Sequence, residues 1–158
     1  MTDNDLIVVG VDGTEGGRRA LRWAVAEARR TGSAVEAVTV WTWDGIEGAM
    51  QAATSPIGER EHAERISLRE VAAVLAEFGT STPVVRKVVE GRTVPVLVGA
   101  ARSARMLVLG SHGYGRFHHA VVGSTSEECI RVVRCPVVII PAPRHVKASE
   151  AAQPIPVS

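Results

Sequence analysis

Two short glycine clusters in the last third of the chain have the residue types and the spacing of a phosphate-binding site. The segment Gly110-Ser-His-Gly113 is followed, after nine residues, by Gly123-Ser-Thr-Ser126. Glycine lets a phosphate approach the main chain, and seryl and threonyl hydroxyls add hydrogen-bond donors. If the first cluster ends a strand and the second begins a helix, the backbone N–H groups of both can meet beyond the same strand end. The pattern therefore predicts a phosphate cradle made of Gly110, His112, Gly113, Gly123, Ser124, Thr125 and Ser126.

The second cluster has another interpretation that needs no ligand. Ser124 and Glu127 stand three residues apart. This is the spacing of a capping box, in which each side chain bonds to the backbone at the start of a helix. The two interpretations are compatible, and both predict a helix that begins in this region.

Strands and helices that would position these clusters alternate along the chain. Leu6–Val11 is a short, continuous β-branched run, typical of a strand buried on both faces, and further strands are predicted at Ala34–Trp41, Val84–Val89, Met106–Leu109 and Pro136–Ile140. Apolar residues at helical spacing lie between them, at Leu21–Ala28 before Gly32, at Leu68, Val71, Leu75 and Phe78, at Val94–Ala101, and over Ser126–Val133. Each helix must bury its stripe against a sheet face through a right-handed crossover. The order therefore predicts an α/β fold, a doubly wound five-stranded parallel sheet flanked by four helices.

Two segments lack this periodicity. Thr42–Glu59 contains three glycines and a proline, so we expect a long mobile loop that acts as a lid over one end of the sheet. Residues 142–158 are rich in proline, alanine and polar residues, which is typical of a disordered tail. The sequence thus predicts one domain over residues 1–141, followed by a tail over residues 142–158.

Three further groups of polar side chains are candidates for the site. Asp12 closes the first predicted strand, where its carboxylate either contacts a ligand or bonds to N–H groups of its own turn. Arg116 lies between the two clusters, where it either reaches a terminal phosphate or keeps a surface loop soluble. The histidines at 112, 118 and 119 have no carboxylate or cysteine set at fixed spacing, so no metal site is predicted.

With these motifs the sequence resembles the universal stress protein family, whose ATP-binding members carry Gly-x-x-Gly, nine residues, and then Gly-Ser/Thr after the fourth strand. The resemblance extends from about residue 5 to residue 141. Besides the clusters, it rests on Val9-Gly-Val-Asp-Gly13, Thr39-Val40, Glu90-Gly91 and Cys135-Pro-Val-Val138. Thr93 and Arg105 depart from the pattern, where a proline and an aspartate are usual, and Thr39 replaces a frequent histidine.

The resemblance implies a fold like that of the adenine nucleotide alpha-hydrolases and a set of contacts to ATP, ADP or AMP. It places Asp12 against the adenosine and gives the backbone of Val40 to the adenine edge. It also implies that Gly110, Gly113, Gly123 and Ser124 bind the ribose and the phosphates. Mg²⁺ or Mn²⁺ would accompany the phosphates, bound through phosphate oxygens and water.

Composition excludes several classes of protein. Eighteen Lys and Arg nearly balance seventeen Asp and Glu, and the net charge of +1 is not that of a dedicated nucleic-acid binder. The apolar runs are far shorter than the ~20 residues that cross a bilayer. Cys129 and Cys135, with no apolar leader at the first residues, favour reduced thiols. We therefore expect a cytoplasmic protein without nucleic-acid or membrane partners.

Three functions are compatible with these features. The first is an ATP-binding stress regulator in which the nucleotide orders loops read by a protein partner. The second is a slow ATPase or phosphoryl-transfer enzyme, although the Walker motif is missing and Glu127 is a candidate base only by proximity. The third is a nucleotide-independent homodimeric module that pairs through the apolar last strand, Val137–Ile140.

Overall fold

The chain folds around a single parallel sheet. The computed structural model describes residues 5–43, 45, 55–111 and 122–143. Its strands are β1 (Leu6–Gly10), β2 (Ala34–Trp41), β3 (Val84–Glu90), β4 (Met106–Gly110) and β5 (Val137–Ile140), in the spatial order β3-β2-β1-β4-β5. The helices are α1 (Glu15–Thr31), α2 (Pro56–Phe78), α3 (Thr93–Ala100) and α4 (Ser124–Val132). The predicted doubly wound α/β fold is confirmed.

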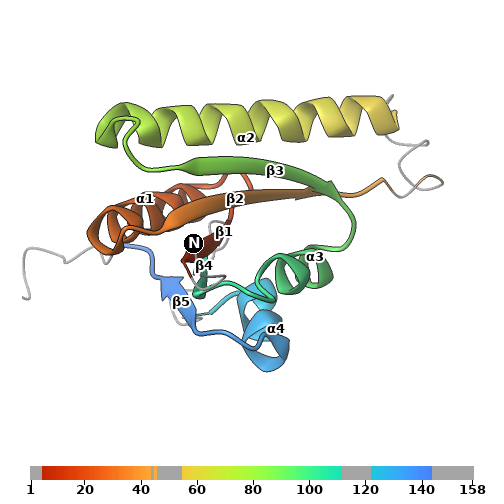
Figure 1. Ribbon diagram of the computed structural model, residues 1–158. Helices are drawn as coiled ribbons and strands as arrows, with labels where there is room; N and C mark the ends of the chain where they lie inside the picture. Colours follow the sequence, from red (N-terminus) through yellow and green to blue (C-terminus); the bar gives the residue numbers. More distant parts are fainter. Residues whose placement is uncertain (1–4, 44, 46–54, 112–121, 144–158) are drawn as a thin grey trace, which may run out of the picture.

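Helices cover both faces of the sheet. One apolar core joins α1 and α2 to one face, and a second core joins α3 and α4 to the other. Figure 1 shows α2 along β3 on one side of the sheet and α3 with α4 on the opposite side. The central residues of β1, Ile7 to Val9, are fully buried, because this strand has a helical layer above and below it. This explains why the strand is a continuous apolar run.

The order of the strands creates the place for a site. β1 pairs with β2 on one side and with β4 on the other, always in parallel. The chain leaves β1 toward one side of the sheet and β4 toward the other, so the connections after these two strands separate. A crevice at this switch point, beyond the carboxyl ends of the strands, is where open α/β sheets bind ligands.

α1 begins and ends at residues whose types set its limits. The side chain of Thr14 caps the start by accepting a hydrogen bond from Gly17 N. Gly32 ends the helix in the left-handed conformation, φ 71°, and its N–H bonds to Ala28 O. The predicted glycine stop is confirmed.

α2 differs from the prediction in both extent and buried face. It begins at Pro56 with Ser55 as N-cap, so residues 56–59, which we expected in the loop, form its first turn. Leu68, expected on the apolar stripe, is 57% exposed. Ser67 and Glu70 are buried instead, and Glu70 is neutralised by Arg18 of α1 at 2.6 Å. Polar side chains that pair across two helices cannot be found from apolar periodicity. Residues 44 and 46–54 of the expected lid lie outside the described residues.

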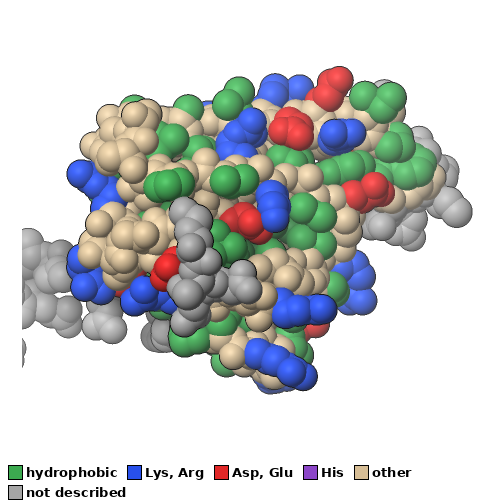
Figure 2. Space-filling model, viewed as in Figure 1, with side chains coloured by type: hydrophobic (Ala, Val, Ile, Leu, Met, Phe, Trp, Pro, Cys, Tyr) green, Lys and Arg blue, Asp and Glu red, His purple; other side chains and the backbone are tan. Residues whose placement is uncertain are grey.

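The surface shows no large area of one charge on the face that can be inspected. Figure 2 shows Lys and Arg side chains interspersed with Asp and Glu along the edge where α2 lies. Among the described residues, no helix is both long and apolar enough to cross a membrane.

Candidate functional site

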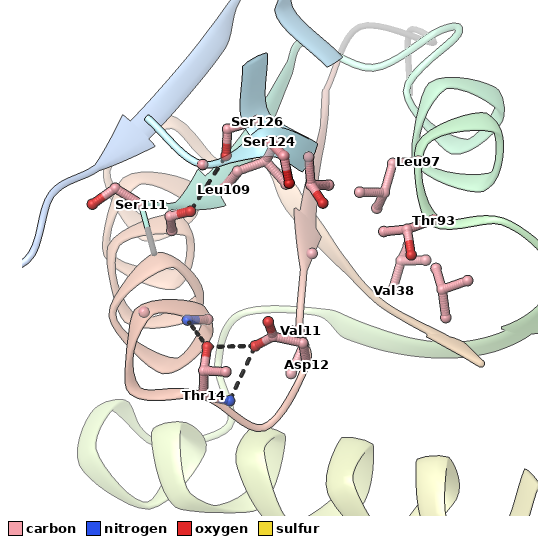
Figure 3. A pocket seen from close by; sticks show the side chains of 17 residues that line it. Val11, Asp12, Thr14, Val38, Thr93, Leu97, Leu109, Ser111, Ser124 and Ser126 are labelled. Carbon is pink, nitrogen blue, oxygen red and sulfur yellow. Dashed lines mark hydrogen bonds between the residues drawn. The ribbon is translucent and has the colours of Figure 1, made fainter. Parts of the chain in front are cut away.

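A pocket opens at the switch point between β1 and β4. Its volume is about 250 Å³. The lining residues come from the ends of β1, β2 and β4 and from the starts of α1, α3 and α4: Gly10, Val11, Asp12, Thr14, Gly16, Gly17, Val38, Val40, Thr93, Leu97, Leu109, Gly110, Ser111, Gly123, Ser124, Thr125 and Ser126. Figure 3 shows side chains from these elements arranged around one common centre.

Seven of the ten residues predicted for the site line this pocket: Asp12, Val40, Gly110, Gly123, Ser124, Thr125 and Ser126. The described part of the first cluster, Gly110 and Ser111, therefore meets the second cluster at one place, although twelve residues separate Gly110 from Gly123 along the chain. His112, Gly113 and Arg116 lie outside the described residues, as do the other two histidines of that segment.

Asp12 stabilises the turn between β1 and α1 and also lines the pocket. Its Oδ1 accepts hydrogen bonds from Thr14 N at 3.0 Å and from Thr14 Oγ1 at 2.6 Å. Thr14 Oγ1 in turn accepts one from Gly17 N at 3.1 Å. The turn role considered for Asp12 is thus present. Asp12 is nevertheless exposed, so its carboxylate borders the open space of the pocket.

The wall between α1 and β4 consists of glycine backbone. A Cβ at Gly110 would lie 2.4 Å from the carbonyl carbon and oxygen of Gly16, and a Cβ at Gly17 would lie 2.6 Å from Asp12 Oδ1. No side chain fits between the first turn of α1 and the end of β4. Gly110 therefore serves the packing of the fold as well as any approach of a ligand.

The start of α4 faces the pocket without a side-chain cap. Gly123 is the N-cap residue, and no side chain of the described residues caps the N–H groups of the first turn. The capping box predicted for Ser124 and Glu127 is wrong: Ser124 is the first residue of the helix, and Glu127 pairs with Arg131 at 2.6 Å. Free N–H groups at a helix N-terminus attract an anion.

A hydrogen bond joins the two glycine clusters to one another. Ser126 Oγ donates to Gly110 O at 3.4 Å, across the gap between α4 and the end of β4. Ser111 Oγ accepts from Ala142 N at 3.2 Å, so the residue after β4 is tied to the segment after β5. These contacts hold the polar side of the pocket in place.

The opposite side of the pocket is apolar. Val38 and Val40 of β2, with Leu97 of α3, line it, and Leu97 is only 2% exposed. Figure 3 shows Val38, Thr93 and Leu97 across the opening from Ser124 and Ser126. The pocket can therefore hold a molecule with a flat apolar part at one end and an anionic part at the other.

Sequence reasoning missed several residues of the wall: Thr14, Gly16, Gly17, Val38, Thr93, Leu97 and Ser111. Val38 and Leu97 have the spacing of ordinary core residues, so no pattern distinguishes them. Thr93 attracts notice only as a departure from the family pattern. The segment Thr14-Glu-Gly-Gly17 does carry a signal, because a capping threonine followed by two glycines marks a helix start that comes close to another backbone.

The described part of the chain offers few groups for bond-breaking chemistry. Asp12 is the one carboxylate on the pocket wall among the residues described there, and Glu127 lies outside that wall with Arg131 as partner. Burial raises the pKa of the Cys129 and Cys135 thiols, which keeps both protonated and poor as nucleophiles. Within the described ranges, no group of three or more His, Cys, Asp or Glu is arranged to hold a metal.

Known proteins resemble this chain in sequence. The model of the universal stress protein family matches residues 4–141. Universal stress protein Rv2624c of Mycobacterium tuberculosis is 32% identical over 134 residues, which are 85% of this chain and 47% of that protein. Universal stress protein Rv2005c of the same organism is 33% identical over 133 residues, 84% of this chain and 44% of that protein. The chain thus spans about half the length of the curated relatives it matches.

Solved structures resemble it in fold. A universal stress protein in complex with cAMP superposes with a TM-score of 0.65 at 21% identity, covering 86% of this chain and 96% of the other. The universal stress protein from Archaeoglobus fulgidus in complex with dAMP gives a TM-score of 0.62 at 20% identity, covering 88% and 98%. From the match of the family model over residues 4–141, together with relatives above 30% identity, this chain belongs to the universal stress protein family.

Proposed function

We propose that the chain binds an adenine nucleotide, ATP, ADP or AMP, in the pocket between β1 and β4, and acts as a nucleotide-dependent regulator of a stress response. The observation that carries the proposal is that Gly110, the second glycine cluster and the N-terminus of α4 meet at one pocket, and that no side chain of the described residues caps this helix. Two structural neighbours are described in complex with cAMP and dAMP, both adenine nucleotides.

The polarity of the pocket sets the orientation of the nucleotide. The adenine packs between β2 and α3, where Val38, Val40 and Leu97 exclude water. The ribose lies near Asp12, and the phosphates lie at the start of α4 beside Ser124, where the helix dipole favours negative charge. Mg²⁺ or Mn²⁺ accompanies the phosphates and is held by their oxygens and by water. The bound state is read by a protein partner, without nucleic acid or membrane.

Replacing Ser124 with aspartate separates binding from folding. A negative charge in the first turn of α4 stabilises the helix by about 0.3–1 kcal/mol, but it repels a phosphate from the same N–H groups. Without nucleotide, the variant should melt no lower than the wild type. With ATP or AMP at a hundred times the dissociation constant, the wild type should gain roughly 5–10 °C and the variant almost nothing. Differential scanning fluorimetry measures both.

The matched control places the same charge away from the pocket. Ser81 is exposed in the connection between α2 and β3, at the other end of the sheet, so Ser81→Asp should keep the full nucleotide shift. The proposal is rejected if millimolar ATP or AMP with Mg²⁺ leaves the wild-type melting temperature unchanged and the purified protein carries no nucleotide.

We also propose that two copies pair through β5. This strand lies at the edge of the sheet, and each of its residues, Val137–Ile140, is partly exposed. The neighbouring α4 exposes Ile130 (48%) and Val132 (51%). Unpaired apolar edges are usually covered, and a two-fold axis lets one edge cover another.

Light scattering at micromolar concentration should give twice the mass of one chain. Val85→Lys changes the opposite edge, where Val85 of β3 is 53% exposed, and should leave that mass unchanged. If the wild type has the mass of one chain, the pairing is contradicted. If the wild type is a dimer but Val85→Lys has the mass of one chain, the copies pair through β3 and not through β5.

A further inference from the structure

Arg19, in the second turn of α1, has only one long ion pair within the described residues. Its Nε is buried and has no hydrogen-bond partner among the residues that the structure describes. Its nearest carboxylate is Glu15, with Nη1 and Oε2 3.6 Å apart, and the Glu15 side chain is 87% exposed. The Arg19 side chain itself is only 19% exposed. A buried guanidinium N–H without an acceptor costs free energy, so the position is not explained by stability.

The other arginines of α1 behave differently. Arg18 and Arg22 each hold a carboxylate of α2 with two hydrogen bonds, and Arg30 holds Glu27 in the same way. Arg29 donates to Phe78 O. Among the five arginines of this helix, Arg19 is the one without a hydrogen bond to another residue in the described part of the chain, and its ion pair with Glu15 is the longest, at 3.6 Å.

The guanidinium of Arg19 lies beside Gly16, one of the residues that line the pocket. A Cβ at Gly16 would be 3.0 Å from Ser111 O and 3.8 Å from Arg19 Nη2. Gly16 and Ser111 both line the pocket, at the end of β4 where Gly110 also lies. Arg19 is not part of the lining, so a group that reaches it must leave the pocket past Gly16.

We infer that Arg19 binds the distal phosphates of the nucleotide and makes the site prefer di- and triphosphates to a monophosphate. The inference rests on the proposed nucleotide site. A first phosphate at the start of α4 stays within the walls, whereas the second and third extend beyond them toward the guanidinium. Arginine suits this role because its planar fork of donors matches phosphate oxygens. The buried Nε gains its acceptor only when the longer nucleotide is bound.

Titration calorimetry with adenosine, AMP, ADP and ATP tests the inference on four forms of the chain: wild type, Arg19→Gln, Arg19→Lys and Arg22→Gln. One charge-assisted contact corresponds to ~10–100-fold in affinity. Arg19→Gln should lower the affinity for ATP and ADP by that factor, and its affinity for AMP and adenosine should stay within about twofold of the wild-type value. The ATP affinity of Arg19→Lys should lie between those of Arg19→Gln and the wild type, because lysine keeps the positive charge but lacks the planar fork of donors. Arg22→Gln, which changes an arginine one turn away that faces α2, should match the wild type for all four ligands.

Melting without ligand supplies an independent readout. Because Arg19→Gln removes an unpaired buried donor, its melting temperature should equal or exceed that of the wild type. Equal weakening of AMP and ATP, or unchanged ATP affinity, overturns the role of Arg19 while the nucleotide site stands. If the wild type binds none of the four ligands, the nucleotide proposal itself fails, and the role of Arg19 fails with it.

Discussion

Replacing Gly110 with alanine is expected to weaken the fold and the nucleotide site together. The added Cβ would lie 2.4 Å from the carbonyl carbon and oxygen of Gly16 and 2.9 Å from its Cα. These are backbone atoms inside the first turn of α1, so no side chain can rotate away to make room. The helix must move off the end of β4, and it carries the pocket wall of Gly16 and Gly17 with it.

The size of the effect follows from overpacking. Forcing a methyl group into a closed contact costs about 1–3 kcal/mol, and more where backbone must move. For a chain of this length the melting temperature should fall by roughly 5–10 °C. The nucleotide-dependent rise in melting temperature should disappear as well, because both walls of the phosphate end are displaced. Scanning fluorimetry with and without ATP measures the two effects on one sample.

Gly99 provides the control for this substitution. A Cβ at Gly99, near the end of α3, meets nothing within 4 Å. Gly99→Ala should therefore stabilise the fold by about 0.5 kcal/mol, since alanine restricts the unfolded chain, and leave nucleotide binding intact. A Gly110→Ala protein that melts and binds like the wild type would show that α1 and β4 are not in the close contact described.

The contact between Gly110 and Gly16 illustrates which features of the fold can be predicted from the sequence and which cannot. β1 spans Leu6–Gly10, close to the bounds that its apolar run indicates, because a strand covered by helices on both faces is built from apolar residues. The role of Gly16 depends on a strand that comes about ninety residues later, and no local pattern reports that contact. Local periodicity therefore predicts the elements, whereas the close approaches between them require the structure.

The same distinction holds for the polar residues. The structure brings Gly123 and Ser124 to one pocket with Gly110, which is the proximity that the spacing of the two clusters predicts. The capping box failed because it assumes that Ser124 precedes the helix, whereas the helix already includes it. Glu70 interrupts the apolar face of α2, and it is tolerated there only because arginines of α1 and α2 reach it.

The pairing of Glu70 should dominate the stability of the layer formed by α1 and α2. Its side chain is fully buried. Arg18 donates from Nε to Oε2 at 2.6 Å and from Nη2 to Oε1 at 2.9 Å, and Arg69 donates to Oε1 at 3.0 Å. The hydrogen bond from Arg18 holds the pKa of Glu70 below its ordinary value, against the effect of burial, which raises it.

Replacing Arg18 with methionine leaves a buried carboxylate with one arginine. Removing one partner of a buried ion pair costs about 3–5 kcal/mol, and because Arg69 remains we expect a loss near the lower end, about 3 kcal/mol at pH 7. The matched control is Arg22→Met. Arg22 and Glu77 lie 2.7 Å apart, but their side chains are 41% and 46% exposed, so the loss should be below about 1 kcal/mol.

The pH dependence identifies the cause of that loss. Because the pKa of Glu70 is lower in the folded protein than in the unfolded chain, its contribution is present above the unfolded value of about 4.3 and is lost as the pH falls through the folded value. In Arg18→Met, burial acts with less opposition, so Glu70 takes up its proton at a higher pH. Urea unfolding of Arg18→Met should show the largest difference in unfolding free energy from the wild type at pH 7 and a smaller one at pH 4.

The double variant with Glu70→Leu, which removes the buried charge, should recover much of the loss of stability at pH 7. An Arg18→Met deficit that equals that of Arg22→Met, or that stays constant with pH, would show that the Glu70 charge does not hold α1 and α2 together.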